Sequence, residues 1–176
     1  MKKLDINNLY EVLRNFVSMR YSLVCIGTEL RNDDRAGLEI CRRVLSRLNR
    51  RICIPVIECI YGLENCVDEI IEMKMNKMLI FDAIVSSELL PGDIVLLNID
   101  ELMDYDVLTT HYIPMNRILD IISNYIGKLQ IAVIGINVKD LDIGFRLSDD
   151  IEKSVRIIVD ALVEIISEVC YSKSKS

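Results

Sequence analysis

The segment "YSLVCIGTELRNDDRAGLEI" (Tyr21–Ile40) changes from one hydrophobic periodicity to another, and this change decides the fold class. Its first part, residues 21–27, is a short apolar run that ends in glycine, which is typical of a strand buried on both faces. Apolar residues then recur at helical spacing as far as the basic turn 47–51, so a helix follows the strand. Two adjacent aspartates, Asp33 and Asp34, stand at the entry to that helix.

The same alternation of strand and helix continues along the chain. Further strands are predicted at residues 52–59, 77–85, 91–98 and 129–136, and further helices at 64–73, 113–125 and 151–169. A Pro-Gly turn leads into 91–98 soon after the preceding strand, which indicates an antiparallel or edge strand. We therefore predict an α/β fold: a single-domain three-layer sandwich with a mostly parallel, five-stranded twisted sheet, one antiparallel strand and helices on both faces.

An extra helix is predicted before this pattern. Apolar residues in the first twenty positions follow the i, i+3, i+4, i+7 rule, namely Leu9, Val12, Leu13, Phe16 and Val17. The chain is thus divided into an N-terminal amphipathic helix (1–20), an α/β domain (21–171) and a polar tail (172–176).

Composition restricts the partners and the compartment. The chain has 176 residues, 51% of them hydrophobic, which suits one globular domain. With 27 acidic and 21 basic residues and no basic stripe, nucleic acid is not an expected partner. No apolar stretch is long enough to span a bilayer or to form the core of a signal peptide, so a soluble protein with no membrane partner is expected.

The cysteines are the second indication of compartment. There are six, with no C-x-x-C pair, and several lie in apolar runs: Cys25, Cys41, Cys53, Cys59, Cys66 and Cys170. This pattern suits reduced cysteines that act as small core hydrophobes, and it favours a cytoplasmic location.

Three places at predicted strand ends could carry chemistry, because open α/β sheets bind ligands beyond the carboxyl ends of their strands. At the first, helix capping is the ordinary role for one aspartate, but Asp33 and Asp34 together leave one without a capping role. At the second, Asp82 follows an apolar run, where burial without a partner is costly; either loop amides or a metal could satisfy it. The third is His111, the only histidine, although a lone histidine is more often a surface or core residue.

Several catalytic designs are excluded. One histidine cannot build an H-E-x-x-H zinc site, and the G-x-S-x-G elbow and the phosphate-binding P-loop are missing. Only one of the three glycines of a dinucleotide fingerprint is present, so no organic cofactor is expected. The remaining set is carboxylates plus one imidazole, which suits a borderline divalent metal such as nickel or zinc. Three protein ligands leave open positions, so the set would work best on a metal that another molecule already holds.

Three segments, in this order and at these separations, resemble the hydrogenase maturation endopeptidases. They are "IGTELRNDDRAGLEI" (26–40), "MLIFDAIVSSELLPGDIVLL" (78–97) and "TTH" (109–111), and the similarity runs from about Ser22 to Val169. The family's first motif usually reads G-x-G-N-x-L-x-x-D-[DE]-x-x-G. Cys25 and Thr28 replace its first glycine and its asparagine, whereas the two aspartates fit.

The resemblance implies an endopeptidase that removes the C-terminal extension of a [NiFe]-hydrogenase large-subunit precursor after nickel insertion. It also implies that Asp34, Asp82 and His111 contact the nickel and form the catalytic site. The nickel would be supplied by the substrate precursor, whose cysteines hold it, and either acid is a candidate base. The precursor is therefore the expected protein partner.

Two alternatives stay open. The first is a non-catalytic, chaperone-like member of the same fold that recognises the metallated precursor, for which the substitutions at Cys25 and Thr28 argue. The second is a thiol-dependent enzyme that uses Cys25 or Cys59 near His111. The sequence specifies neither the client hydrogenase, nor the cleavage position, nor the oligomeric state.

Overall fold

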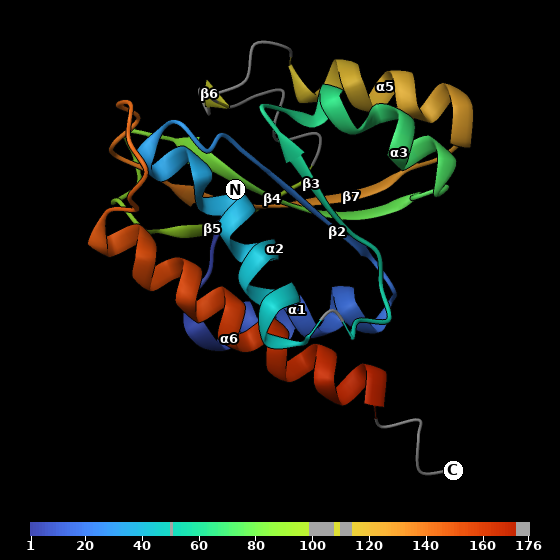
Figure 1. Ribbon diagram of the computed structural model, residues 1–176, viewed down its shortest axis with the longest axis horizontal. Coiled ribbons are helices and arrows are strands. Elements are labelled where there is room, and N and C mark those ends of the chain that lie inside the picture. The colour runs from blue at the N-terminus through green and yellow to red at the C-terminus, as the bar shows by residue number, and fades with distance from the viewer. Residues whose placement is uncertain (50, 99–107, 110–113, 172–176) are drawn as a thin grey trace.

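The computed structural model describes residues 1–49, 51–98, 108–109 and 114–171, and Figure 1 shows its arrangement. The strands are β1 (Lys2–Lys3), β2 (Ser22–Gly27), β3 (Val56–Ile60), β4 (Lys77–Val85), β5 (Ile94–Asn98), β6 (Leu108–Thr109) and β7 (Gln130–Asn137). The α-helices are α1 (Ile6–Ser18), α2 (Ala36–Arg47), α3 (Val67–Glu72), α5 (Met115–Ile126) and α6 (Asp149–Tyr171), and two 3₁₀ turns are η1 (Asn32–Arg35) and η2 (Leu63–Cys66).

The sheet has the predicted mostly parallel topology. Its strand order is β1-β5-β7-β4-β2-β3, and β6 pairs with β4. Strands β3, β2, β4 and β7 run parallel, whereas β5 runs antiparallel to β7. The five-stranded sheet with one antiparallel strand is confirmed, and the two-residue strands β1 and β6 extend it. The partner of β5 is β7, which comes later in the chain than β5 itself.

The three layers are also confirmed. Helices α1, α2 and α6 cover one face of the sheet, and α3 and α5 cover the other (Figure 1). Strand β4 lies at the centre, and its side chains alternate between the two cores because successive residues of a strand point to opposite faces. Leu79, Phe81 and Ala83 join the core under α1, α2 and α6, whereas Met78 and Ile80 join the core under α3 and α5.

Helix α1 is amphipathic, as its spacing predicts. Leu9, Leu13 and Val17 are buried on one side, and Asp5 caps the helix by accepting a hydrogen bond from the Asn8 amide. The buried side belongs to the same core as α6, so α1 shares the packing of the main fold. Within the part of the chain that the structure describes, no helix has an apolar stretch long enough to cross a membrane.

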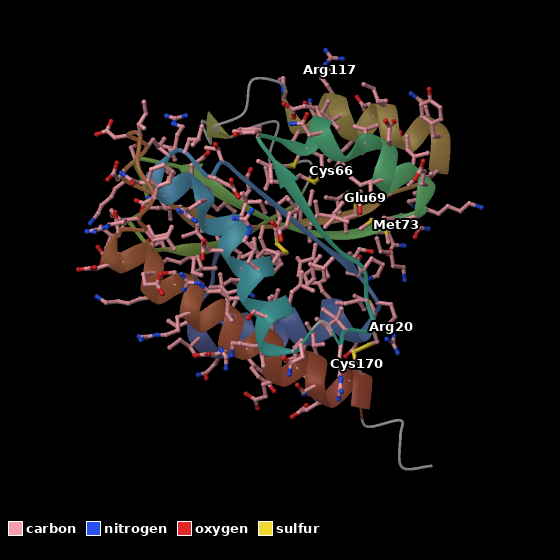
Figure 2. All side chains as sticks on the ribbon, in the orientation of Figure 1. Arg20, Cys66, Glu69, Met73, Arg117 and Cys170 are labelled. Atoms are coloured by element: carbon pink, nitrogen blue, oxygen red, sulfur yellow. A yellow bond between two sulfur atoms is a disulfide. The ribbon has the colours of Figure 1, made fainter. Side chains whose placement is uncertain are left out.

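The expectation of reduced cysteines is wrong, because all six are joined in disulfides. Cys25 in β2 bonds to Cys41 in α2, and Cys59 in β3 bonds to Cys66 in η2. The third bridge joins Cys53 to Cys170 near the end of α6, beside Arg20 (Figure 2). The paired cysteines are 16, 7 and 117 residues apart, so no common spacing in the sequence predicts which cysteines pair. The thiol-dependent alternative thereby loses its nucleophiles, since neither Cys25 nor Cys59 is a free thiol.

Candidate functional site

A glycine brings the start of α2 onto the ends of two central strands. A Cβ atom at Gly37 would lie 2.2 Å from the carbonyl oxygen of Ile26 in β2 and 2.6 Å from that of Phe81 in β4. Only glycine permits this approach. Asp34 lies three positions before Gly37, and Asp82 follows Phe81 directly, so the same packing brings both acidic segments to one edge of the sheet. Accordingly, η1 contacts both β2 and β4.

The adjacent aspartates of η1 are both buried, and Asp33 has a structural role. Its carboxylate is 0% exposed and accepts hydrogen bonds from the Asp140 amide (3.0 Å), the Ser148 amide (2.6 Å) and the Ser148 hydroxyl (2.9 Å). The Asp33 amide donates in return to the Asp140 carbonyl (2.9 Å). Asp33 therefore fastens the loop between β7 and α6 to the end of β2.

Asp34 lies in the same turn and is 2% exposed. Its backbone oxygen packs against Gly27, where a Cβ atom would approach that oxygen to 2.3 Å. The turn is thus held from two sides, by Gly27 at the end of β2 and by the bonds of Asp33. The residue pattern alone left open which of the two acids is structural, and the family resemblance gave the site role to Asp34. The hydrogen bonds now give Asp33 a structural role.

Asp82 is 1% exposed and lies inside β4, three residues before its end. The prediction placed it at a strand end, which needs a correction. The pairing of β4 with β2 stops at Phe81, whereas β4 continues because it stays paired with β7 as far as Ile84 and then pairs with β6. Asp82 therefore lies just beyond the paired part of β2, and one of its carboxylate oxygens accepts a hydrogen bond from the Ala83 amide (2.8 Å).

His111, the third predicted site residue, lies outside the described residues. The described strand β6 ends two positions before it and pairs with β4 at Ile84 and Val85, shortly after Asp82. Among the residues that the structure describes, no three His, Cys, Asp or Glu side chains form a group that could hold a metal ion.

The loop after β3 reaches the same edge of the sheet. The sequence pattern did not predict that this loop has an ordered conformation. Its disulfide closes residues 59–66, and the Tyr61 amide donates to the carbonyl of Gly27 at the end of β2 (2.8 Å). Inside the loop, the Asn65 side chain donates to the Ile60 carbonyl (2.9 Å). Two cysteines that flank a predicted strand-to-helix turn were the available signal.

One group of ion pairs, around Arg43, lies between α2 and α6. Arg43 pairs with Glu152 on α6 (2.5 Å) and with Glu39 on its own helix (3.0 Å). The hydrogen bond from Arg43 is the main reason why the pKa of Glu152 lies below its ordinary value. These contacts fasten α2 to α6 and do not touch Asp34 or Asp82.

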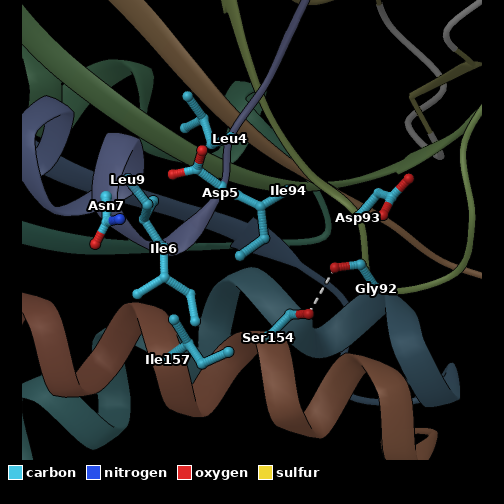
Figure 3. A pocket seen from close by; sticks show the side chains of 10 residues that line it. All are labelled: Leu4, Asp5, Ile6, Asn7, Leu9, Gly92, Asp93, Ile94, Ser154 and Ile157. Atoms are coloured by element: carbon cyan, nitrogen blue, oxygen red, sulfur yellow. Dashed lines mark hydrogen bonds between the residues drawn. The ribbon is translucent and has the colours of Figure 1, made fainter.

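A cavity of about 530 Å³ lies elsewhere, between the start of α1, the start of β5 and α6 (Figure 3). It contains two aspartates, each with a structural role. Asp5 caps α1, and Asp93 pairs with Lys3 (2.7 Å) and accepts from the Leu90 amide (3.0 Å). The lining includes neither Asp34 nor Asp82, and β5 is separated from β4 and β2 in the strand order. This cavity and the predicted chemistry therefore lie in different places.

Comparisons with known proteins identify relatives of the chain. The sequence model of the HycI family, described as hydrogenase maturation protease, matches residues 56–166. The match includes Asp82 and the position of His111, and it begins after Asp34. The chain is also 25% identical over 140 residues to the hydrogenase 3 maturation protease of Escherichia coli K12, which covers 80% of this chain and 86% of that protein.

Solved structures share the fold. The [NiFe] hydrogenase maturation protease HybD from Thermococcus kodakarensis aligns with a TM-score of 0.68 at 25% identity, over 84% of this chain and 99% of that chain. HycI from Thermococcus kodakarensis KOD1 aligns with a TM-score of 0.73 at 22% identity, over 89% of this chain and 99% of that chain.

Proposed function

Because the chain belongs to the hydrogenase maturation protease family, we propose that it is an endopeptidase that removes the C-terminal extension of a [NiFe]-hydrogenase large-subunit precursor after nickel insertion. The observation that carries the proposal is the placement of two buried acids from separate elements at one edge of the sheet. Asp34 comes from η1 and Asp82 from β4, and the close packing at Gly37 brings their segments together.

The three proposed site residues would bind nickel that the precursor already holds. Asp34, Asp82 and His111 supply two carboxylates and one imidazole, a set that suits nickel but leaves coordination positions open. Such a set binds weakly by itself and gains affinity when the ion arrives with other ligands attached. Recognition of substrate-bound nickel would thus restrict cleavage to precursors that have received their metal.

The same residues would position the scissile peptide bond. A protein substrate anchored at one point presents its backbone in a restricted orientation, which lowers the entropic barrier to cleavage. One of the two acids then accepts the proton of the attacking water. Asp33 has no place in this step, since its carboxylate is bonded to the loop between β7 and α6.

We also propose a cytoplasmic location. The three disulfides restrict the kind of cytoplasm in which the protein could be found. Disulfides persist in oxidising compartments and, as an exception, in intracellular proteins of hyperthermophiles. A cytoplasmic protein with three bridges would belong to the second group. Alkylation of thiols in a freshly quenched, denatured cell extract tests whether the bridges persist in the cytoplasm. Alkylation of all six cysteines of the chain would contradict persistent bridges there.

Cleavage of a purified precursor tests the function. The protein is incubated with precursor loaded with nickel, and with the same precursor without metal, and both are analysed by mass spectrometry. Loss of mass at the C-terminus of the loaded precursor only is the expected result. A stable complex without loss of mass would instead support a non-catalytic, chaperone-like role, and cleavage of both precursors would remove nickel recognition from the proposal.

A further inference from the structure

The loop after β3 is a closed ring. Cys59 and Cys66 are both buried and are joined by a disulfide, so the backbone between them has few conformations available. Further hydrogen bonds connect the Gly62 amide to the Cys59 carbonyl and the Asn65 amide to the Gly62 carbonyl. The ring is therefore ordered by its own covalent and hydrogen bonds, independently of any bound molecule.

This ring is attached to the edge that carries the two acids. The Tyr61 amide donates to the carbonyl of Gly27, and Gly27 packs so closely on the Asp34 backbone that a Cβ atom would clash there. A single residue at the end of β2 thus lies between the backbone of Tyr61 and that of Asp34. A side chain that projects from Tyr61 is next to the place where the proposed substrate must bind.

Tyr61 is held in an unusual state for a large apolar residue. Its φ angle is 71°, in the left-handed region, and its side chain is 54% exposed. That conformation costs a residue with a Cβ atom about 1 kcal/mol. Tyr61 thus combines a strained backbone with an exposed aromatic side chain, inside the loop that the Cys59–Cys66 disulfide closes. Such a combination suits an aromatic side chain that is ordered in advance for contact with a partner.

From these contacts we propose that Tyr61 is a specificity-determining residue that packs on an apolar side chain of the protein substrate near the scissile bond. The inference rests on the proposed function, which brings a polypeptide to this edge. A second exposed apolar side chain, Leu30, follows the adjacent strand β2 and is 48% exposed. The segments after β2 and β3 therefore each carry an exposed apolar side chain, which suits an apolar segment of a polypeptide.

Kinetics with nickel-loaded precursor test this role. Tyr61→Gly removes the side chain while glycine accepts the φ angle, so the fold is retained and KM rises about tenfold with kcat unchanged. Tyr61→Phe keeps the ring and should retain the wild-type KM. The double variant Cys59→Ala/Cys66→Ala opens the loop and should raise KM about threefold, since ordering of the side chain is lost. Tyr125→Ala, at an exposed tyrosine on α5, is the matched control.

Binding measured separately keeps the two proposals distinguishable. If the wild type cleaves the precursor and Tyr61→Gly has the wild-type KM and Kd, the role of Tyr61 is refuted while the protease function stands. If the wild type binds the precursor without cleaving it, the protease function is refuted, and a tenfold weaker Kd for Tyr61→Gly still supports the contact.

Discussion

The sheet edge at the ends of β2 and β4 and the cavity beside β5 both contain aspartates, but they place them differently. In the cavity, Asp5 and Asp93 act as a helix cap and as the partner of a lysine at the surface. At the sheet edge, Asp34 and Asp82 are almost fully buried. Placing a carboxylate in so apolar an environment costs free energy that a structural role at the surface does not require. The comparison shows that this cavity does not contain the acids of the proposed site. Burial alone does not identify them either, since Asp33 is fully buried and has a structural role.

The largest expected effect is on processing activity. Asp34→Asn and Asp82→Asn keep the side-chain volume but remove the charge, so each should lower kcat/KM for the loaded precursor about 10³-fold, or about 4 kcal/mol. His111→Ala should have an effect of the same order. Circular dichroism should match the wild type in all three variants.

The matched control for these variants is Asp93→Asn in the cavity, which should leave processing unchanged. If Asp93→Asn abolished cleavage and Asp82→Asn did not, the cavity would be the site, and the comparison between the two regions would be reversed.

The next largest effect is on stability and tests how the edge is built. Gly37→Ala places a Cβ atom against two backbone oxygens, so the unfolding free energy should fall by about 3 kcal/mol. Urea denaturation measures this loss. A wild-type unfolding free energy for Gly37→Ala would mean that close packing at Gly37 does not shape the edge.

A smaller effect separates the adjacent aspartates of η1. Asp33→Ala leaves the Asp140 and Ser148 amides without their acceptor, which should cost about 2 kcal/mol of unfolding free energy. Ser148→Ala loses only the hydroxyl bond and should cost about 1 kcal/mol. The melting temperature reports both changes. A wild-type melting temperature for Asp33→Ala would contradict its structural role.

The smallest effect concerns an exposed acid, Glu152, whose pKa is lowered mainly by the hydrogen bond from Arg43. A lowered folded-state pKa contributes stability above the unfolded value of about 4.3, and this contribution is lost as pH falls through the folded pKa. Glu152→Gln should therefore cost under about 1 kcal/mol at pH 7, because the pair is partly exposed, and nothing at pH 2. Denaturation at the two pH values measures it. An equal loss at both would exclude the ion pair as its cause.

Much of the fold was predictable because it depends on local periodicity. Strand β4 has the predicted bounds, since a predominantly apolar run between polar flanks is typical of a strand in the middle of a sheet. Strand β3 begins at Val56, later than predicted, because Pro55 lacks the amide that a ladder needs. The partner of β5 was less accessible, since β7 comes later in the chain and pairing across that separation leaves no local signal.

The sequence by itself determined the α/β architecture and the two acidic segments that face one edge, because hydrophobic spacing acts through residues near in the chain. Only the tertiary structure decided which of Asp33 and Asp34 is structural, because Ser148, which bonds Asp33, lies 115 residues away in the chain. It also decided the disulfides, since cysteines pair by proximity in space, whatever their separation in sequence.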